Sequence, residues 1–140
     1  MAGRKAPLLA AIATLAVAAA GAAAWWLTRP AAVPGGPVTV MVPALSARET
    51  LGAQSFARNC QPCHGPNAAG GDKGPPLVHP IYQPGHHSDL AFAFAMQRGT
   101  QQHHWHFGDM PAQPQVPLAE QGAITAYIRA LQRANGILAE

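Results

Sequence analysis

The chain has 140 residues, of which 49% are apolar and 11% charged, and it contains only two cysteines. This length and cysteine count exclude a multidomain enzyme and a scaffold held together by several disulfides. The net charge of +3 comes from the first 30 residues, since residues 31–140 hold six Lys/Arg and six Asp/Glu. Because that larger part is formally neutral, the sequence does not predict binding to nucleic acid.

The first predicted element is a stretch of 23 uncharged residues, 6–28, between Lys5 and Arg29. A helix of this length crosses a hydrocarbon core of about 30 Å. With positive charge concentrated before it, residues 1–29 are predicted to be a signal-anchor, a transmembrane segment whose N-terminus stays in the cytoplasm. A cleaved signal peptide is the alternative, because Ala22 to Ala24 offer small residues for cleavage. The rest of the chain is then expected on the periplasmic face of a bacterial-type inner membrane or, after cleavage, free in the periplasm.

Residues 30–45 form a Pro- and Gly-rich segment without charge or helical periodicity. This composition predicts a linker. In a polyproline-like conformation such a segment would reach about 45 Å, so we expect it to let the following domain reorient. The globular domain is predicted to cover residues 46–140.

Three helices are predicted in this domain. The first begins at Ser46, which has the spacing of a capping box with Glu49. The second begins at Ser88 and ends at Gly99, which are typical helix-capping residues. The third covers about residues 118–133, where apolar side chains form one stripe. All other segments are predicted to be loops. The fold class is therefore all-α, and so small a core favours a large buried cofactor that completes it.

The most specific motif is Cys60-Gln61-Pro62-Cys63-His64. The Cys-x-x-Cys-His spacing is typical of c-type haem attachment. Side chains three residues apart share one face of a helical turn, so both sulfurs can form thioethers to one porphyrin edge while His64 binds the iron. A thioredoxin-like redox pair, a zinc half-site and a disulfide are the alternatives. A thioredoxin-like motif opens a helix whereas this one closes a helix, and a zinc site needs more ligands of suitable spacing. We therefore predict one covalent haem c.

With this motif the chain resembles the class I cytochrome c family, over about residues 46–135. Gly52 and Phe56 precede the motif as the packing residues of the family's first helix do, and Tyr127 lies on a terminal helix that would cross it. The resemblance implies a cytochrome c-like fold of about three main helices around the haem. In this chain, the predicted membrane-anchor helix would precede that fold.

The resemblance also implies how the iron is held. Gly74-Pro75-Pro76-Leu77 is similar to the family's Gly-Pro-x-Leu loop, which implies that the Pro75 carbonyl accepts a hydrogen bond from His64 Nδ1 and leaves Nε2 for the metal. Met110 matches the position of the family's distal methionine. The resemblance therefore implies that His64 and Met110 are the metal ligands, and this ligand pair raises the reduction potential.

Six further histidines have no role in this scheme: His79, His86, His87, His103, His104 and His106. Solvated loop imidazoles are the simplest interpretation, and a transition-metal site such as copper is the alternative. His103, His104 or His106 could also replace Met110 as the distal ligand, as could Met96, although its helix position favours the core. Trp105 is expected to pack against the haem edge.

Together these features predict a membrane-tethered monohaem cytochrome that transfers one electron at a time between membrane-associated redox partners. Such a protein is a carrier and not an enzyme. One alternative is the cytochrome subunit of a multisubunit membrane oxidoreductase. The other is a ligand-binding haem sensor or peroxidase-like protein, in which Met110 would be detached from the iron.

Overall fold

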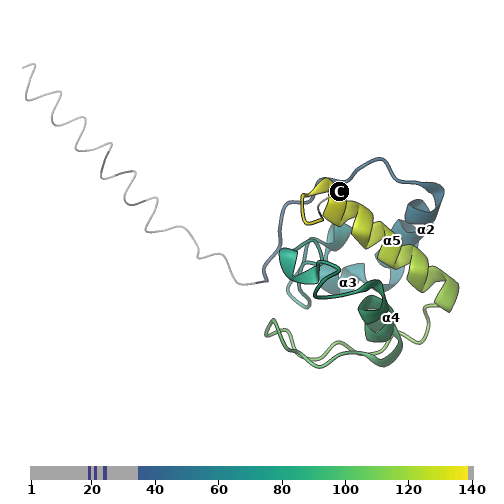
Figure 1. The fold of residues 1–140 in the computed structure, drawn as a ribbon. Helices are drawn as coiled ribbons and strands as arrows, with labels where there is room; N and C mark the ends of the chain where they lie inside the picture. The colour runs from purple at the N-terminus through teal and green to yellow at the C-terminus, as the bar shows by residue number, and fades with distance from the viewer. Residues whose placement is uncertain (1–18, 20, 22–23, 25–34, 139–140) are drawn as a thin grey trace, which may run out of the picture. The chain divides into compact units, whose positions relative to one another are not determined.

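A computed structural model describes residues 35–138, together with Ala19, Gly21 and Ala24. The chain divides into two units, residues 1–32 and 33–140, and the account below concerns the second (Figure 1). The predicted anchor over residues 6–28 lies outside the described residues, except for those three, which are helical. In the described part of the chain, no helix is both long enough and apolar enough to cross a membrane.

Helices build the second unit. They are α2 (Ala47–Asn59), α3 (Gln61–His64), α4 (Asp89–Arg98) and α5 (Leu118–Ala134), with two 3₁₀ turns, η1 (Pro66–Ala68) and η2 (Pro80–Tyr82). The described residues contain no strand, so the all-α prediction is confirmed for this part of the chain. The three longer helices lie where the sequence predicts them, and α3 is the helical turn expected for the Cys-x-x-Cys-His motif, whereas η1 and η2 occupy segments predicted to be loop.

The caps of α2 and α4 form as their sequences predict. The Ser46 hydroxyl accepts a hydrogen bond from the Glu49 N–H at 3.3 Å, and the Glu49 carboxylate accepts one from the Ser46 N–H at 2.8 Å. The Ser88 hydroxyl accepts from the Ala91 N–H at the start of α4. Gly99 ends α4 at φ +74°, a conformation that favours glycine. These side chains pair backbone groups that a helix end leaves free.

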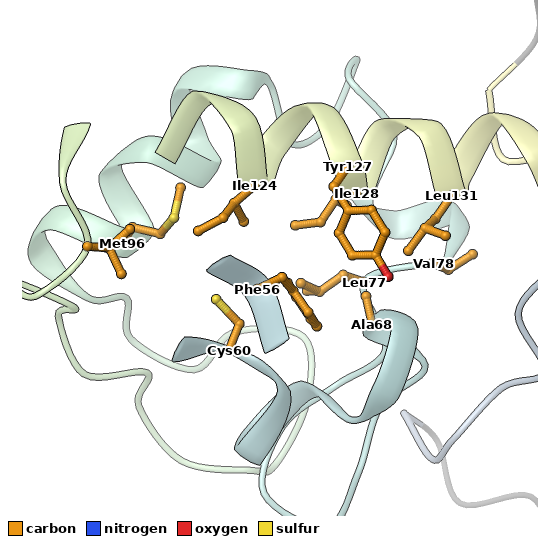
Figure 2. Close-up of a cluster of buried hydrophobic side chains, with 11 residues drawn as sticks. Phe56, Cys60, Ala68, Leu77, Val78, Met96, Ile124, Tyr127, Ile128 and Leu131 are labelled. Atoms are coloured by element: carbon orange, nitrogen blue, oxygen red, sulfur yellow. The ribbon is translucent and has the colours of Figure 1, made fainter. Parts of the chain in front are cut away.

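The core lies where α2 packs against α5. Phe56 of α2 meets Tyr127 of α5 with 5.7 Å between ring centroids, and Figure 2 shows both inside a cluster of buried side chains. The cluster consists of Phe56, Cys60, Ala68, Leu77, Val78, Met96, Val116, Ile124, Tyr127, Ile128 and Leu131. Met96 is therefore a core residue, as its helix position predicts.

Residues 35–45, the described part of the predicted linker, have no helix or strand but are hydrogen-bonded to the domain. The Val38 N–H donates to the Ala69 carbonyl at 2.7 Å. The backbone N–H and carbonyl of Met41 pair with the side-chain amide of Asn135 at 2.9 and 2.8 Å. This part is therefore held against the domain and differs from a free tether.

Candidate functional site

The Cys-x-x-Cys-His motif occupies a single helical turn at the junction of α2 and α3. Cys60 ends α2, and its carbonyl accepts hydrogen bonds from the N–H groups of Cys63 and His64 at 3.1 and 2.9 Å. This turn leaves Cys60 buried and Cys63 exposed, and both thiols are free. The two sulfurs are therefore one turn apart and unpaired, as covalent attachment of a group to both requires.

Cys60 itself is not a reactive thiol. Burial, and then the neighbouring Cys63, raise the pKa of Cys60 to about 11. A dithiol exchange site needs a thiol with a lowered pKa, because the thiolate is the nucleophile. Cys60 therefore stays protonated at neutral pH and is not itself a nucleophile for dithiol exchange.

His64 is held in one tautomer. Its Nδ1 lies 2.9 Å from the carbonyl oxygen of Pro75. Because a carbonyl only accepts, Nδ1 carries the proton and Nε2 keeps its lone pair. Burial lowers the pKa of His64, while the bond to Pro75 partly opposes that shift. The ring is therefore neutral at neutral pH, which is the form that binds a metal.

The loop after His64 folds back over the motif. The Gly70 N–H donates to the His64 carbonyl at 2.7 Å. A Cβ on Gly74 would lie 3.1 Å from the Cys63 carbonyl oxygen and 3.3 Å from His64 Nδ1. A Cβ at these distances would displace its neighbours by a few tenths of an ångström, so glycine favours the close approach that brings Pro75 to the imidazole.

Met110 is fixed by its backbone. Its N–H and carbonyl both pair with Thr100, each at 2.9 Å, in an isolated antiparallel bridge. Gly99 makes room for this bridge, since a Cβ there would lie 2.4 Å from the Met110 carbonyl oxygen. Residues 101–109 form a loop between the two bridged residues, called the distal loop below.

A cavity of about 400 Å³ lies next to these residues. This volume is in the usual range for small-molecule sites, about 300–1,000 Å³. Cys60, His64, Pro75 and Met110 all line it, and Met96 reaches it from the core. Its apolar wall includes Phe56, Leu77, Phe92, Ile124 and Ile128. The structure thus brings four of the five predicted site residues to one apolar cavity, while Cys63 lies at the surface.

Trp105 also lines this cavity. Its Nε1 donates a hydrogen bond to the Tyr82 hydroxyl at 3.1 Å. Its ring meets that of His79 edge-on, with 5.1 Å between centroids. Trp105 therefore connects the distal loop to η2, and its packing against a haem edge stays a prediction.

Arg129 is a buried cation that the sequence analysis did not identify. Its side chain is 6% exposed, and its guanidinium donates to Asp89 Oδ1 at 2.8 Å and to the Tyr82 carbonyl at 2.6 Å. It also donates to the His87 carbonyl. Arg129 therefore ties α5 to the segment between η2 and α4. In the sequence, its burial could have been inferred only from its position directly after Ile128, at the border of the apolar stripe.

Four of the six unassigned histidines lie together, and the other two lie apart from them. His86 and His87 lie close to His103 and His104 of the distal loop. His79 instead caps η2, where its Nδ1 accepts a hydrogen bond from the Ile81 N–H. His106 is exposed on the distal loop. Solvated loop imidazoles therefore do not describe the whole set.

The family model of cytochrome c matches residues 49–132, more than half of the chain. The match covers nearly all of α2, the motif, the distal loop and most of α5. Neither the curated proteins nor the solved structures contain a significant match to this chain.

Proposed function

This chain belongs to the cytochrome c family, and we propose that it is a monohaem electron carrier whose iron is ligated by His64 and Met110. Membership of the family implies a covalently bound haem c and haem-based electron transfer. Cys60 and Cys63 fit the attachment motif. The number of haems and both axial ligands are the specific parts of the proposal.

One observation carries it: a single apolar cavity is lined by Cys60, by His64 and by Met110. His64 has an unprotonated Nε2, because the Pro75 carbonyl holds the proton on Nδ1. Met110 offers a soft thioether sulfur on a backbone that Thr100 fixes. A haem bound there would supply a one-electron iron couple, and two occupied axial positions favour electron transfer over oxygen binding.

The exposed position of Cys63 suggests the side of the domain through which electrons would enter and leave. Cys63 is exposed, whereas Cys60 and His64 are buried. A haem edge attached at Cys63 would therefore be the part closest to solvent. Because residues 31–140 are formally neutral, we expect weak docking through a small interface, below about 1,200 Å².

The proposal extends to the membrane. Residues 6–28 would anchor the protein in a bacterial-type inner membrane, with the haem domain and its redox partners on the periplasmic side. Membrane fractionation and the intact mass of the mature protein test this part. A soluble product that begins after Ala24 would contradict the anchor, and a stable copurifying complex would instead favour a subunit of a larger oxidoreductase.

Absorption spectra test the axial ligands. We expect the haem iron of the mature wild-type protein to be low-spin in both oxidation states and to show the weak sulfur-to-iron charge-transfer band. We also expect the reduced protein not to bind carbon monoxide. Met110→Leu should lose that band and bind carbon monoxide. Met96→Leu is the matched control and should keep the band, because it conserves volume at a core position.

Three outcomes would contradict this function. Mass spectrometry that finds only the bare polypeptide would remove the covalent haem. A wild-type protein that binds carbon monoxide readily would favour a sensor or peroxidase-like role. If the wild type lacks the sulfur band and Met110→Leu leaves its spectrum unchanged, a distal-loop histidine is the ligand instead.

A further inference from the structure

Four imidazoles meet beside the cavity, from the two segments that flank α4. His86 and His87 precede α4, and His103 and His104 lie in the distal loop after it. The Nε2 atoms of His86 and His104 are 3.1 Å apart, and those of His87 and His103 are 3.4 Å apart. Residues 16 to 18 positions apart in sequence thus direct ring nitrogens at one another.

When both rings are neutral, the pair His87 and His103 has no proton between its Nε2 atoms. His87 Nδ1 lies 2.7 Å from the Ile81 carbonyl oxygen, and His103 Nδ1 lies 2.8 Å from that of Gln101. Each Nδ1 must carry the proton of its neutral ring, since carbonyls only accept. Both Nε2 atoms therefore present lone pairs to each other. A cation in this position would remove their repulsion.

The distances suit a metal ion. Ligand nitrogens of His86, His87 and His104 all lie within 4.8 Å of one another. At a metal–nitrogen distance of about 2.0–2.1 Å, nitrogens at bond angles between a right angle and a tetrahedral angle are about 2.9–3.4 Å apart. The 3.1 Å between His86 and His104, two members of this set, falls in that interval, and so does the 3.4 Å between His87 and the neighbouring His103.

The surroundings of the cluster resemble those of metal-binding histidines. Such residues usually donate their second ring N–H to a backbone carbonyl or carboxylate, which fixes the tautomer. His87 does so with Ile81, just as His64 does with Pro75. The backbone of His87 is itself held by Arg129.

The cluster is accessible to an ion, and two of its members have a lowered pKa. His86 is exposed, while His87 and His104 are partly buried, so an ion can reach it from solvent. Burial lowers the pKa of His87 and of His104, and the neighbouring imidazoles lower both further. Neutral imidazole is the metal-binding form.

From this geometry we infer that His86, His87 and His104 bind one divalent transition-metal ion, with His103 beside the fourth position. Imidazole ligands suit Cu²⁺ and Zn²⁺ in particular. The ion would connect the segment before α4 to the distal loop, which ends at Met110. None of these three histidines has a role on the iron in the proposed function, so the inference does not depend on the haem ligands.

Zinc stoichiometry of the oxidised, haem-loaded protein tests the site. After equilibrium dialysis against micromolar Zn²⁺, we expect one zinc per iron in the wild type. His87→Gln and His104→Gln should weaken zinc binding at least about tenfold, as changes around metal ligands do. His106→Gln is the matched control: it removes an exposed histidine from the same loop and should bind zinc like the wild type.

Two further measurements keep the test decisive. An unchanged haem spectrum shows that each variant is folded. If His87→Gln does not incorporate haem, the result for His104→Gln alone decides the test. Electron paramagnetic resonance of bound Cu²⁺ should show nitrogen ligands. The inference is overturned if the wild type binds no zinc or if the cluster variants bind zinc as well as the wild type. It is also overturned if His106→Gln loses zinc binding to the same extent, or if the copper spectrum shows only oxygen ligands.

Discussion

Gly52 and Ala123 meet where α2 packs against α5, so closely that a Cβ on Gly52 would lie 2.0 Å from the Ala123 carbonyl oxygen. A backbone carbonyl cannot rotate away as a flexible side chain can. The separation of the two helices is therefore set at this contact, and with it the position of Phe56 against Tyr127.

Gly52→Ala is expected to destabilise the domain by about 1–2 kcal/mol. Overpacking typically costs about 1–3 kcal/mol, and the higher helix propensity of alanine offsets about 1 kcal/mol of the loss. The matched control is Gly122→Ala in α5, where a Cβ would meet only the end of the Arg48 side chain. Urea unfolding that shows equal stability for Gly52→Ala and the wild type would contradict the close contact.

Arg129→Met should reduce the free energy of unfolding by about 2 kcal/mol. The variant leaves the His87 carbonyl without its donor and the Tyr82 carbonyl with only the longer bond from the Gln132 amide at 3.3 Å, and an unsatisfied buried group costs about 1–3 kcal/mol. Arg58→Met is the control, because its ion pair with Glu120 is exposed and should contribute at most about 1 kcal/mol. Equal losses in urea titrations of the two variants would show that Arg129 is not a structural tie.

The stability of the capping box should depend on acid pH. Hydrogen bonds from Ser46 lower the pKa of Glu49 below its ordinary value of 4.5. A folded-state pKa below the unfolded one means that this contribution is complete above about pH 4.5 and is lost as the pH falls through the folded value. Thermal unfolding should therefore show Glu49→Gln less stable than the wild type at pH 7, with the difference shrinking towards pH 3. A difference that is constant with pH would contradict this assignment.

Zinc should stabilise the folded protein reversibly. Free zinc at 100 times its dissociation constant should raise the free energy of unfolding by about 2.7 kcal/mol, if it binds only the folded state. A chelator should return the protein to its original stability, and His104→Gln should not respond. Thermal scans in which wild type and variant respond alike would assign the effect to other sites.

Local sequence patterns predicted the parts of the fold that depend on neighbours in the chain. The pairing of Ser46 with Glu49 and the stop at Gly99 are short-range interactions, and both occur where expected. The packing of Gly52 and Phe56 near Tyr127 followed from the family resemblance. The Cys-x-x-Cys-His spacing likewise predicted one helical turn, since three residues nearly complete a turn.

Features that depend on distant residues were not predictable in the same way. The bonds of Arg129 to the segment before α4 join residues at least 40 positions apart. The attachment of Met41 to Asn135 joins residues 94 positions apart, and a Pro-rich composition does not predict such a contact. The sequence showed that histidines are numerous, but only the fold shows which of them face one another.

Because the bridge between Thr100 and Met110 closes the distal loop at its base, the position of Met110 does not depend on the length of that loop. Residues inside a loop closed at its base can be exchanged, inserted or deleted with little displacement of the residues that close it. His103 and His104 lie inside this closed loop, and Met110 lies at its base. Evolution can therefore gain or discard the histidine cluster while the sulfur stays at the same point on the cavity wall.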